Sequence, residues 1–312
     1  MARPILILLI LISTLLSGLN FPIGKLGLTF SSPFLLLAIR FIAAGLIMVP
    51  LIIKRPHPKA GLEWGKITVI GLLQSVLVLG INYVSMETIT SSSASILSST
   101  NPIWTIILGA MFFGMRHRWW QWLGVIIGFL GVFITLGFHV QLQIGALYAL
   151  LAGMIWGLAT ILTGRWGKTL DTWVMTAYQM LFGGIMLLIV SFLFEQPHFS
   201  MASGALAKNI LVLIWLILLG SIANFVTWFT VLRHYDPEKA GSFLFLVPFF
   251  GVLFGFLLLH ETIQWYVLIG VALIGVGIYL VNRKRVFSIR LKDQRLALTR
   301  DIPGEKMSKC NG

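Results

Sequence analysis

Arg40 is a charged residue inside a long apolar segment, residues 33–53. An ionised side chain within a bilayer costs about 2.5 kcal/mol or more, so it must face a cavity or the interior of a helix bundle. In one interpretation, its guanidinium attracts a carboxylate or another anion. In the alternative, the guanidinium bonds carbonyl groups where helices break, or extends to one membrane surface. Arg40 is therefore a candidate binding group with a competing structural role.

Two prolines occupy matching places in apolar runs that lie 146 residues apart. Pro102 lies midway along residues 91–114, and Pro248 lies midway along residues 240–260. Proline removes a backbone donor and disrupts a helix one turn upstream. The freed carbonyls are tolerated in a membrane only where they face protein or water. The pair predicts hinges or cavity-lining breaks at equal depth, with Asn101 as a neighbouring polar candidate, whereas the alternative is a simple packing kink.

Aromatic rings and hydrogen-bonding groups occur together in several apolar segments. An aromatic cavity with few polar groups suits amphipathic metabolites such as aromatic or branched amino acids. The same residue types also fill membrane cores, anchor interfaces and join helices. Trp156 and Tyr178 lie deeper than the aromatic residues at span starts and are the preferred candidates. The other cavity candidates are Gln179, which matches Arg40 at an offset of 139 residues, Thr160 and Asn224.

The segments that carry these residues are long, apolar and numerous. Hydrophobic residues make up 58% of the 312 residues, and only 11% are charged, against roughly a quarter in soluble domains. Apolar runs of about 18 residues or more can cross a bilayer as helices. The chain is therefore predicted to be an all-α integral membrane protein with about ten transmembrane helices. Their predicted ranges are 5–24, 33–53, 66–84, 92–113, 119–138, 143–163, 172–193, 209–231, 239–260 and 264–282.

The net charge of +13 comes from Lys and Arg residues whose distribution along the chain indicates the orientation of the protein in the membrane. If the N-terminus is cytoplasmic, inside segments hold 20 of the 23 Lys and Arg residues, as the positive-inside rule requires. The sequence therefore predicts a multi-pass protein of the inner or plasma membrane with both termini in the cytoplasm. Basicity of this kind does not indicate a nucleic-acid partner. The expected partners are the lipid bilayer and a small-molecule substrate, and the oligomeric state stays open.

The chain also contains two related halves. An offset of 146 relates the later spans and pairs Pro102 with Pro248, Trp119 with Trp265, Gly124 with Gly270 and Gly131 with Gly277. An offset of 139 relates the earlier spans and pairs Gly18 with Gly157, Ala38 with Ala177 and Gly45 with Gly184. A longer connection around residues 195–208 accounts for the difference. The predicted repeats are residues 1–140 and 141–282, followed by a basic cytoplasmic tail, residues 283–312. Because five spans per copy is an odd number, the repeats are expected to be inverted, an arrangement that allows alternating access.

This arrangement resembles the drug/metabolite transporter superfamily, specifically its EamA family of ten-helix carriers. The residues that carry the resemblance are Ala38-Ile39-Arg40-Phe41, Asn101-Pro102, Trp156-Gly157, Ala240-Gly241-Ser242, Pro248 and His260-Glu261-Thr262. The chain departs from the family's common pattern at Met115, where an acid is usual, and at Ser17-Gly18, where Trp-Gly is usual. The resemblance implies a transporter of a small organic metabolite, an amino acid or related compound, with efflux as the favoured direction. The alternatives are a multidrug exporter and a membrane-embedded sensor or scaffold without flux.

Energy coupling has one candidate pair, Glu261 and His260, at the end of the ninth predicted span. Proton-coupled pumps usually rely on buried carboxylates or histidines. The predicted spans contain no acidic residue, and the six histidines lie at span ends or in loops. A solvated loop acid is the competing interpretation of Glu261, so the sequence favours facilitated or exchange transport. No Gly-x-x-x-x-Gly-Lys-Ser/Thr loop, His-Glu-x-x-His motif or Cys/His cluster occurs. The sequence therefore predicts no enzymatic activity, metal or cofactor.

Overall fold

The computed structural model of the chain describes residues 3–115, 117–135, 143–200, 205–234 and 246–282. These residues are mostly helical, and the β-structure among them is an isolated bridge between Ser31 and Phe199. The prediction of an all-α chain is thus confirmed for the described part. The predicted tail with Cys310, and the motif Ala240-Gly241-Ser242, lie outside the described residues.

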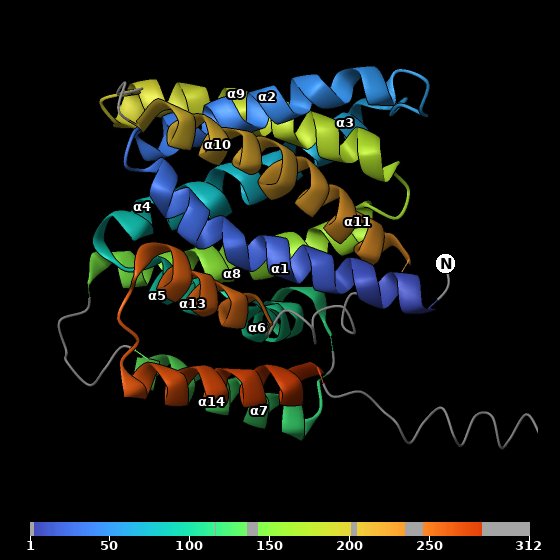
Figure 1. Ribbon diagram of the computed structural model, residues 1–312. Helices are drawn as coiled ribbons and strands as arrows, with labels where there is room; N and C mark the ends of the chain where they lie inside the picture. The colour runs from blue at the N-terminus through green and yellow to red at the C-terminus, as the bar shows by residue number, and fades with distance from the viewer. Residues whose placement is uncertain (1–2, 116, 136–142, 201–204, 235–245, 283–312) are drawn as a thin grey trace, which may run out of the picture. The chain divides into compact units, whose positions relative to one another are not determined.

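Figure 1 shows the helices in chain order. Their bounds are α1 (Arg3–Gly27), α2 (Pro33–Ile52), α3 (Gly61–Gly71), η1 (Leu72–Leu79), α4 (Gly80–Thr88), α5 (Ser91–Ser98), α6 (Asn101–Phe113), α7 (Trp119–Thr135), α8 (Ile144–Trp166), α9 (Thr172–Phe194), α10 (Leu206–Ile217), η3 (Leu218–Ala223), α11 (Asn224–His234), α13 (Leu246–Leu259) and α14 (Trp265–Asn282). A helix satisfies its backbone hydrogen bonds internally, which is why long apolar runs adopt this form in lipid.

Among the described residues, seven helical segments are long and apolar enough to cross a membrane. They are Ile7–Gly27, Pro33–Ile52, Gly61–Thr88, Ser91–Phe113, Ile144–Trp166, Thr172–Phe194 and Leu206–His234. Shorter apolar helices are Trp119–Thr135, Leu246–Leu259 and Trp265–Leu280. Each coincides with one predicted span, although residues 136–138 and 239–245 of the fifth and ninth predicted spans are not described.

Two of the long segments change to π-helix in the middle. The π-helical stretch η1 separates α3 from α4, and η3 separates α10 from α11. Both begin with the order Leu-Leu-x-Ser, at residues 72–75 and 218–221. A π-helix bonds from residue i to i+5, and such stretches occur frequently at functional sites.

A helix break lies immediately before Pro102. α5 ends at Ser98, and α6 begins at Asn101 with Pro102 in its first turn, where the missing N–H removes no helical hydrogen bond. The hydroxyl of Thr100 donates to the carbonyl of Leu97 at 2.7 Å, so a side chain satisfies part of the freed backbone. Pro248 is buried near the N-terminal end of the described part of α13.

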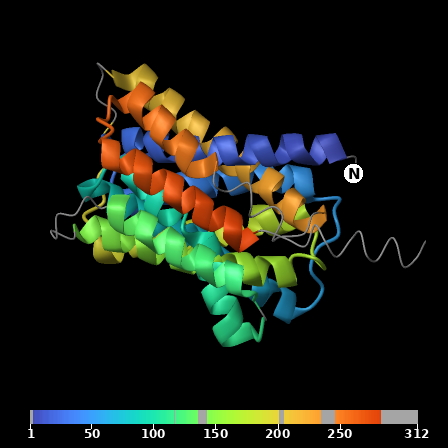
Figure 2. The ribbon, with the colours of Figure 1, turned by 90° about the horizontal axis from the view of Figure 1, so that it is seen from below.

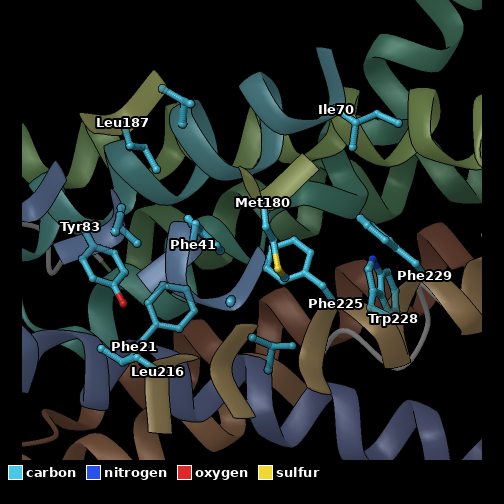
Figure 3. Packing of buried hydrophobic residues seen from close by; sticks show 14 of the residues in the cluster. Phe21, Phe41, Ile70, Tyr83, Met180, Leu187, Leu216, Phe225, Trp228 and Phe229 are labelled. Carbon is cyan, nitrogen blue, oxygen red and sulfur yellow. The ribbon is translucent and has the colours of Figure 1, made fainter. Parts of the chain in front are cut away.

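Most of the closest helix pairs join a helix from the first part of the chain to one from the second part. α2 lies along α9, and α7 lies along α14 at the edge of the bundle that Figure 2 presents to the viewer. α1 contacts α13 and α11, while α8 contacts α4, α5 and α6. The core between them is apolar, and Figure 3 shows Phe41, Met180, Phe225 and Phe229 packed together there.

Carboxylates in the connections satisfy the starts of two helices. The Oδ1 atom of Asp171 accepts hydrogen bonds from the backbone N–H groups of Trp173 and Val174, at 2.9 and 3.2 Å, where α9 begins. The Oε1 atom of Glu195 accepts from the N–H of Leu35 at 2.9 Å in the first turn of α2. A negative charge beside unpaired N–H groups stabilises a helix start. Glu195 therefore connects the end of α9 to the beginning of its partner α2.

Candidate functional site

A cavity lies between α1, α2, η1, α4, α8 and α11. Its lining consists of Ser17, Asn20, Phe21, Arg40, Gln74, Val78, Leu79, Asn82, Tyr83, Met86, Trp156, Asn224, Phe225 and Trp228. The space for centres of water-sized molecules is about 60 Å³, whereas one water requires about 10–15 Å³ on that measure. The lining combines aromatic rings with amides and a guanidinium. The cavity therefore offers both aromatic surface and hydrogen-bonding groups to an occupant.

Arg40 lies in the middle of α2 with no exposed surface, and three neutral groups hold its guanidinium. Nε donates to the hydroxyl of Ser221 at 2.6 Å, and Nη1 donates to the hydroxyl of Tyr83 at 2.9 Å. Nη2 donates to the carbonyl of Gly220 at 2.6 Å. Within the described part of the chain, Arg40 forms no ion pair with an acidic residue. The positive charge is thus oriented by neutral partners and is not neutralised by a carboxylate of those residues.

Gly220 permits this close approach of Arg40 to the backbone of η3. A Cβ atom at position 220 would lie 2.6 Å from Oδ1 of Asn20 and 3.3 Å from Nη2 of Arg40. The carbonyl of Gly220 also accepts a hydrogen bond from Nδ2 of Asn20 at 3.2 Å. One backbone carbonyl therefore organises a side chain from α1 and another from α2, and a larger residue would separate them.

Trp156 and Asn224 also line the cavity. Trp156 comes from the middle of α8. Asn224 is the first residue of α11, and its Oδ1 accepts hydrogen bonds from the hydroxyls of Ser13 and Ser17, at 3.3 and 3.1 Å. Asn224 thereby joins α11 to α1 directly after the π-helical stretch η3.

Gln179 and Tyr178 lie on α9, outside the cavity lining. Gln179 is fully buried, and its Oε1 accepts a hydrogen bond from the hydroxyl of Ser75 in η1 at 3.2 Å. The ring of Tyr178 packs edge to face against Trp64, with the centroids 4.7 Å apart, and also against His57. These two predicted residues therefore contact α3, η1 and the connection before α3.

Thr160 and Asn101 also lie outside the lining. The hydroxyl of Thr160 donates to the backbone carbonyl of Trp156 within α8, at 2.8 Å. Asn101 is buried at the start of α6, and its carbonyl accepts from the hydroxyl of Thr105 at 2.8 Å. The hydroxyls of Thr160 and Thr105 thus bond their own helices, which is a common way for Thr to satisfy its hydroxyl in a membrane helix. The side-chain Oδ1 of Asn101 forms no hydrogen bond with the described residues.

Glu261 caps a helix of the other half. Its carboxylate accepts hydrogen bonds from the N–H groups of Ser91 and Ser92, at 2.7 and 3.0 Å, at the start of α5. The hydroxyl of Ser92 donates to the same carboxylate. His260 has a φ of 53°, a left-handed conformation uncommon outside glycine, and it turns the chain after α13 so that Glu261 reaches α5. The structure thus places the candidate coupling residue at a helix end, away from the cavity.

Several cavity residues were not among the sequence candidates. Among them are Asn20, Phe21, Asn82, Tyr83, Phe225 and Trp228 from the lining, and Ser221 behind Arg40. One signal for Asn20 was present, because Ser13, Ser17 and Asn20 recur at spacings of four and three residues and share one helix face. The Leu-Leu-x-Ser order that occurs twice was a comparable signal for Ser221.

Long apolar helices around a partly polar cavity are typical of multi-pass membrane transporters. The sequence model of the EamA-like transporter family matches residues 4–137 and, a second time, residues 143–283. The chain belongs to this family, so the resemblance seen in the sequence is confirmed. It is accordingly a membrane transporter embedded in the lipid bilayer.

Relatives with similar sequences are also named as transporters. The uncharacterized transporter YvbV of Bacillus subtilis (strain 168) is 27% identical over 283 residues, which cover 89% of this chain and 91% of YvbV. The uncharacterized inner membrane transporter YedA of Escherichia coli (strain K12) is 27% identical over 291 residues, covering 88% and 92%. A protein crystal structure that is 18% identical has a TM-score of 0.67 and covers 93% of this chain and 100% of its own. That likeness shows the fold.

Proposed function

We propose that this protein exports a small organic metabolite, an amino acid or a related compound, by alternating access between two inverted five-helix repeats, residues 1–140 and 141–282. The observation that carries the proposal is a set of contacts between the halves that exchange under the repeat offsets. If two halves are equivalent, each contact from the first half to the second has a counterpart in the reverse direction. Three such exchanges occur around the cavity and at the edge of the bundle.

The first exchange involves Gly18 on α1 and Gly157 on α8, which the offset of 139 pairs. A Cβ atom on Gly18 would lie 2.5 Å from Cβ of Phe250 in α13. A Cβ atom on Gly157 would lie 3.0 Å from Cβ of Trp104 in α6. Trp104 and Phe250 are themselves paired by the offset of 146. α1 therefore packs on α13 at the position where α8 packs on α6.

The second exchange lies between α7 and α14. A Cβ atom on Gly131 would lie 2.7 Å from the carbonyl oxygen of Gly270, and one on Gly277 would lie 2.7 Å from the carbonyl oxygen of Gly124. The offset of 146 turns Gly124 into Gly270 and Gly131 into Gly277, so it turns one contact into the other. Small residues allow the two backbones to approach closely.

The third exchange is polar and borders the cavity. Arg40 on α2 bonds Ser221 of η3, and Gln179 on α9 bonds Ser75 of η1. The offset of 139 pairs Arg40 with Gln179, and the offset of 146 pairs Ser75 with Ser221. Apolar and polar contacts thus follow the same exchange.

These exchanges support alternating access because equivalent halves can adopt two arrangements of similar energy. When the halves trade conformations, a cavity between them opens to one membrane face and then to the other. An odd number of spans per half supports the inverted orientation, with both termini in the cytoplasm. The outward direction and the metabolite class are supported by the family resemblance and by the amphipathic cavity lining.

Flux through reconstituted protein tests this function. Proteoliposomes loaded with a mixed metabolite pool would be analysed by mass spectrometry with and without a pH gradient. We expect selective loss of amino acids or related compounds from vesicles that contain the protein. Selective flux of lipophilic drugs would instead support a multidrug exporter, and no flux by folded protein would support a sensor or scaffold.

Cysteine accessibility tests the alternating mechanism separately. The chain has one cysteine, Cys310, which is first replaced by serine. Single cysteines at Ser17 and Asn224, which line the cavity, should react with membrane-impermeant thiol reagents from either face. A cysteine at Ala177, fully buried where α9 packs, provides the unreactive control. Labelling of the cavity positions from one face alone would contradict alternating access.

A further inference from the structure

A second cavity lies at one end of the bundle. It is bounded by the connection from α2 to α3, the connection from α8 to α9, the starts of α3 and α9, and the last turn of α11. These helix ends lie on the right in Figure 1, as does the start of α1. The space for centres of water-sized molecules is about 280 Å³, several times that of the cavity beside Arg40. The titratable residues of its lining are His57, Lys59, Glu63, Asp171 and Arg233.

The second cavity lies at the depth of lipid headgroups. Five of the seven long spanning segments begin or end around it, and such segments begin and end where the hydrocarbon core meets the headgroups. Trp173, in the first turn of α9, is a residue type enriched at this boundary. The guanidinium of Arg55 lies over its ring, 5.0 Å from the centroid. The basic residues of these connections predict that this end faces the cytoplasm, where the leaflet is rich in anionic lipids.

The two carboxylates of the lining already have partners. Oδ1 of Asp171 accepts from two N–H groups at the start of α9, and Oδ2 pairs with Nη1 of Arg55 at 3.4 Å. Oε2 of Glu63, in the first turn of α3, accepts from the backbone N–H of Lys59 at 3.0 Å. Helix starts and a guanidinium thus offset both negative charges.

The two basic side chains of the lining keep their donors. Within the described part of the chain, Nζ of Lys59 forms no hydrogen bond. Nη1 of Arg233 lies 4.0 Å from Oδ2 of Asp171, beyond hydrogen-bond distance, and its side chain is 41% exposed. A guanidinium binds the oxygens of a phosphate in fork geometry, and an ammonium group binds phosphate as a compact charge. Arg233 and Lys59 are therefore free to hold a phosphate.

We propose that the second cavity binds the headgroup phosphate of an anionic phospholipid, with Arg233 and Lys59 as its ligands. Arg233 ends α11 in the second half of the chain, and Lys59 precedes α3 in the first half, so a bound phosphate connects the halves. Leu62, next to Glu63 in the first turn of α3, is 73% exposed and offers apolar surface to an acyl chain. The proposal goes beyond the proposed function and does not depend on which substrate is carried.

The arrangement favours an anionic lipid over two other sources of phosphate. A zwitterionic phospholipid carries a quaternary ammonium group next to its phosphate, and this group repels Arg233 and Lys59. A soluble phosphate ester gains nothing from the depth of the cavity or from the exposed surface of Leu62. Basic pockets between helices on the cytoplasmic side are a recurring way to bind anionic headgroups.

Titration of the full chain with three probes tests the proposal. Native mass spectrometry from detergent would count the bound molecules of phosphatidylglycerol, phosphatidylcholine and sn-glycerol 3-phosphate. We expect one molecule of phosphatidylglycerol to bind at least about tenfold more tightly than phosphatidylcholine or sn-glycerol 3-phosphate. Equal binding of phosphatidylcholine would overturn the preference for a negative headgroup. Equal binding of sn-glycerol 3-phosphate would overturn a lipid as the source of the phosphate.

A pair of double variants with the same change of charge locates the site. Lys59→Gln with Arg233→Gln should weaken the binding of phosphatidylglycerol by about tenfold, since both ligands lose their charge. The matched control is Lys54→Gln with Arg165→Gln. These two residues are exposed, lie in segments predicted to face the cytoplasm and are outside the lining, so we expect a change of about twofold or less. Equal losses in the two double variants would show a general attraction to basic surface and would overturn the site.

Thermal unfolding in detergent provides a second measurement. A ligand that binds the folded state raises its stability, so phosphatidylglycerol should raise the thermal midpoint of the wild type and of the control variant. It should raise the midpoint of Lys59→Gln with Arg233→Gln much less. The midpoints without lipid report whether the variants fold, and a lipid-induced rise equal in all three proteins would overturn the proposal. Both measurements are independent of flux, so a failure of the carrier function would leave this result unaffected.

Discussion

Arg40 and Gln179 occupy equivalent positions in the two halves, yet their surroundings differ. Each bonds a serine of the opposite half inside a π-helical stretch, Ser221 for Arg40 and Ser75 for Gln179. Arg40 carries a charge and lines the cavity, whereas Gln179 is neutral and lies outside the lining. Both halves therefore use a hydrogen bond to a serine at this position, but only the first half supplies a charged side chain.

The residue before each serine explains the difference. Gly220 precedes Ser221 and leaves space for the guanidinium beside its carbonyl. Gln74 precedes Ser75, and its Nε2 donates to the hydroxyl of Thr163 at 3.4 Å. The guanidinium of Arg40 therefore reaches the cavity, whereas the amide of Gln179 lies outside its lining.

Exchanging Arg40 and Gln179 should have the largest effect on the difference between the two halves. In the double variant with Arg40→Gln and Gln179→Arg, the composition is unchanged and the charge moves to a site without a cavity. We expect transport to fall about 100-fold or more and the thermal midpoint to drop, because an uncompensated buried charge is strongly destabilising. Counterflow and a thermal unfolding scan in detergent measure the two effects.

The single variant Arg40→Gln is the control for the exchange. It should lose transport to a similar degree while keeping most of its stability, since Gln can still bond Ser221. Wild-type transport in the double variant would show that the charge acts equally well from either half, and the one-sided site would then be wrong.

The matched substitutions Gly220→Ala and Gln74→Ala test whether the residue before each serine accounts for the different surroundings of Arg40 and Gln179. The new Cβ at position 220 would lie 2.6 Å from Oδ1 of Asn20, so the side chains must move, at a cost of about 1–3 kcal/mol for overpacking. We expect transport to fall about tenfold in Gly220→Ala, and about threefold or less in Gln74→Ala, which removes one hydrogen bond. Initial rates of counterflow compare the two, and equal losses would contradict the explanation.

The helices were largely predictable from the sequence. Each predicted span coincides with a described apolar helix or with consecutive helices, because a chain in lipid has to satisfy its own backbone. Pro102 indicated the break before α6, because proline lacks a backbone N–H and disrupts the helix one turn upstream. The π-helical stretches were not predicted, since hydropathy carries no signal for a change in hydrogen-bond register. The Leu-Leu-x-Ser order that occurs twice marks them in retrospect.

The cavity lining was predictable in part. Depth along a helix can be estimated from hydropathy, and an unpaired charge such as Arg40 must avoid lipid. The direction of a side chain is harder, because neighbouring residues on an α-helix point about 100° apart. Tyr178 and Gln179 have the expected depth, but their side chains face α3 and η1. Depth gives no signal for Asn20, because it lies near the end of its predicted span.

Replacing both Pro102 and Pro248 by Ala asks whether the two halves share equivalent hinges. Each new alanine restores an N–H donor, and the alanine at position 102 also removes the constraint that separates α5 from α6. We expect transport to fall about fivefold with little change in the thermal midpoint, because Pro102 lies in a first turn where it costs no helical hydrogen bond. Unchanged flux in the double variant would remove the hinge role.

Glu261→Gln tests an end of the bundle where the halves also differ. Glu261 caps α5, whereas its counterpart at the offset of 146, Met115, has no carboxylate. Loss of the charge at a helix start should cost about 0.5–1 kcal/mol and reduce transport about twofold. We expect wild-type flux to be equal with and without a pH gradient. A gradient that accelerates the wild type but not Glu261→Gln would instead make Glu261 a coupling residue.

The smallest effect is expected on α9, next to Gln179. Tyr178→Phe removes a hydroxyl and leaves the ring against Trp64, so transport should stay within about twofold of the wild type. Tyr83→Phe is the matched comparison at the cavity, because the Tyr83 hydroxyl accepts a hydrogen bond from Arg40. Loss of this hydroxyl leaves a buried charged donor unpaired, so we expect transport to fall about tenfold. Initial rates for the two variants measure the contrast directly. If Tyr178→Phe lost as much transport as Tyr83→Phe, α9 would contribute to the substrate path as α2 does, and the binding chemistry would be shared between the halves after all.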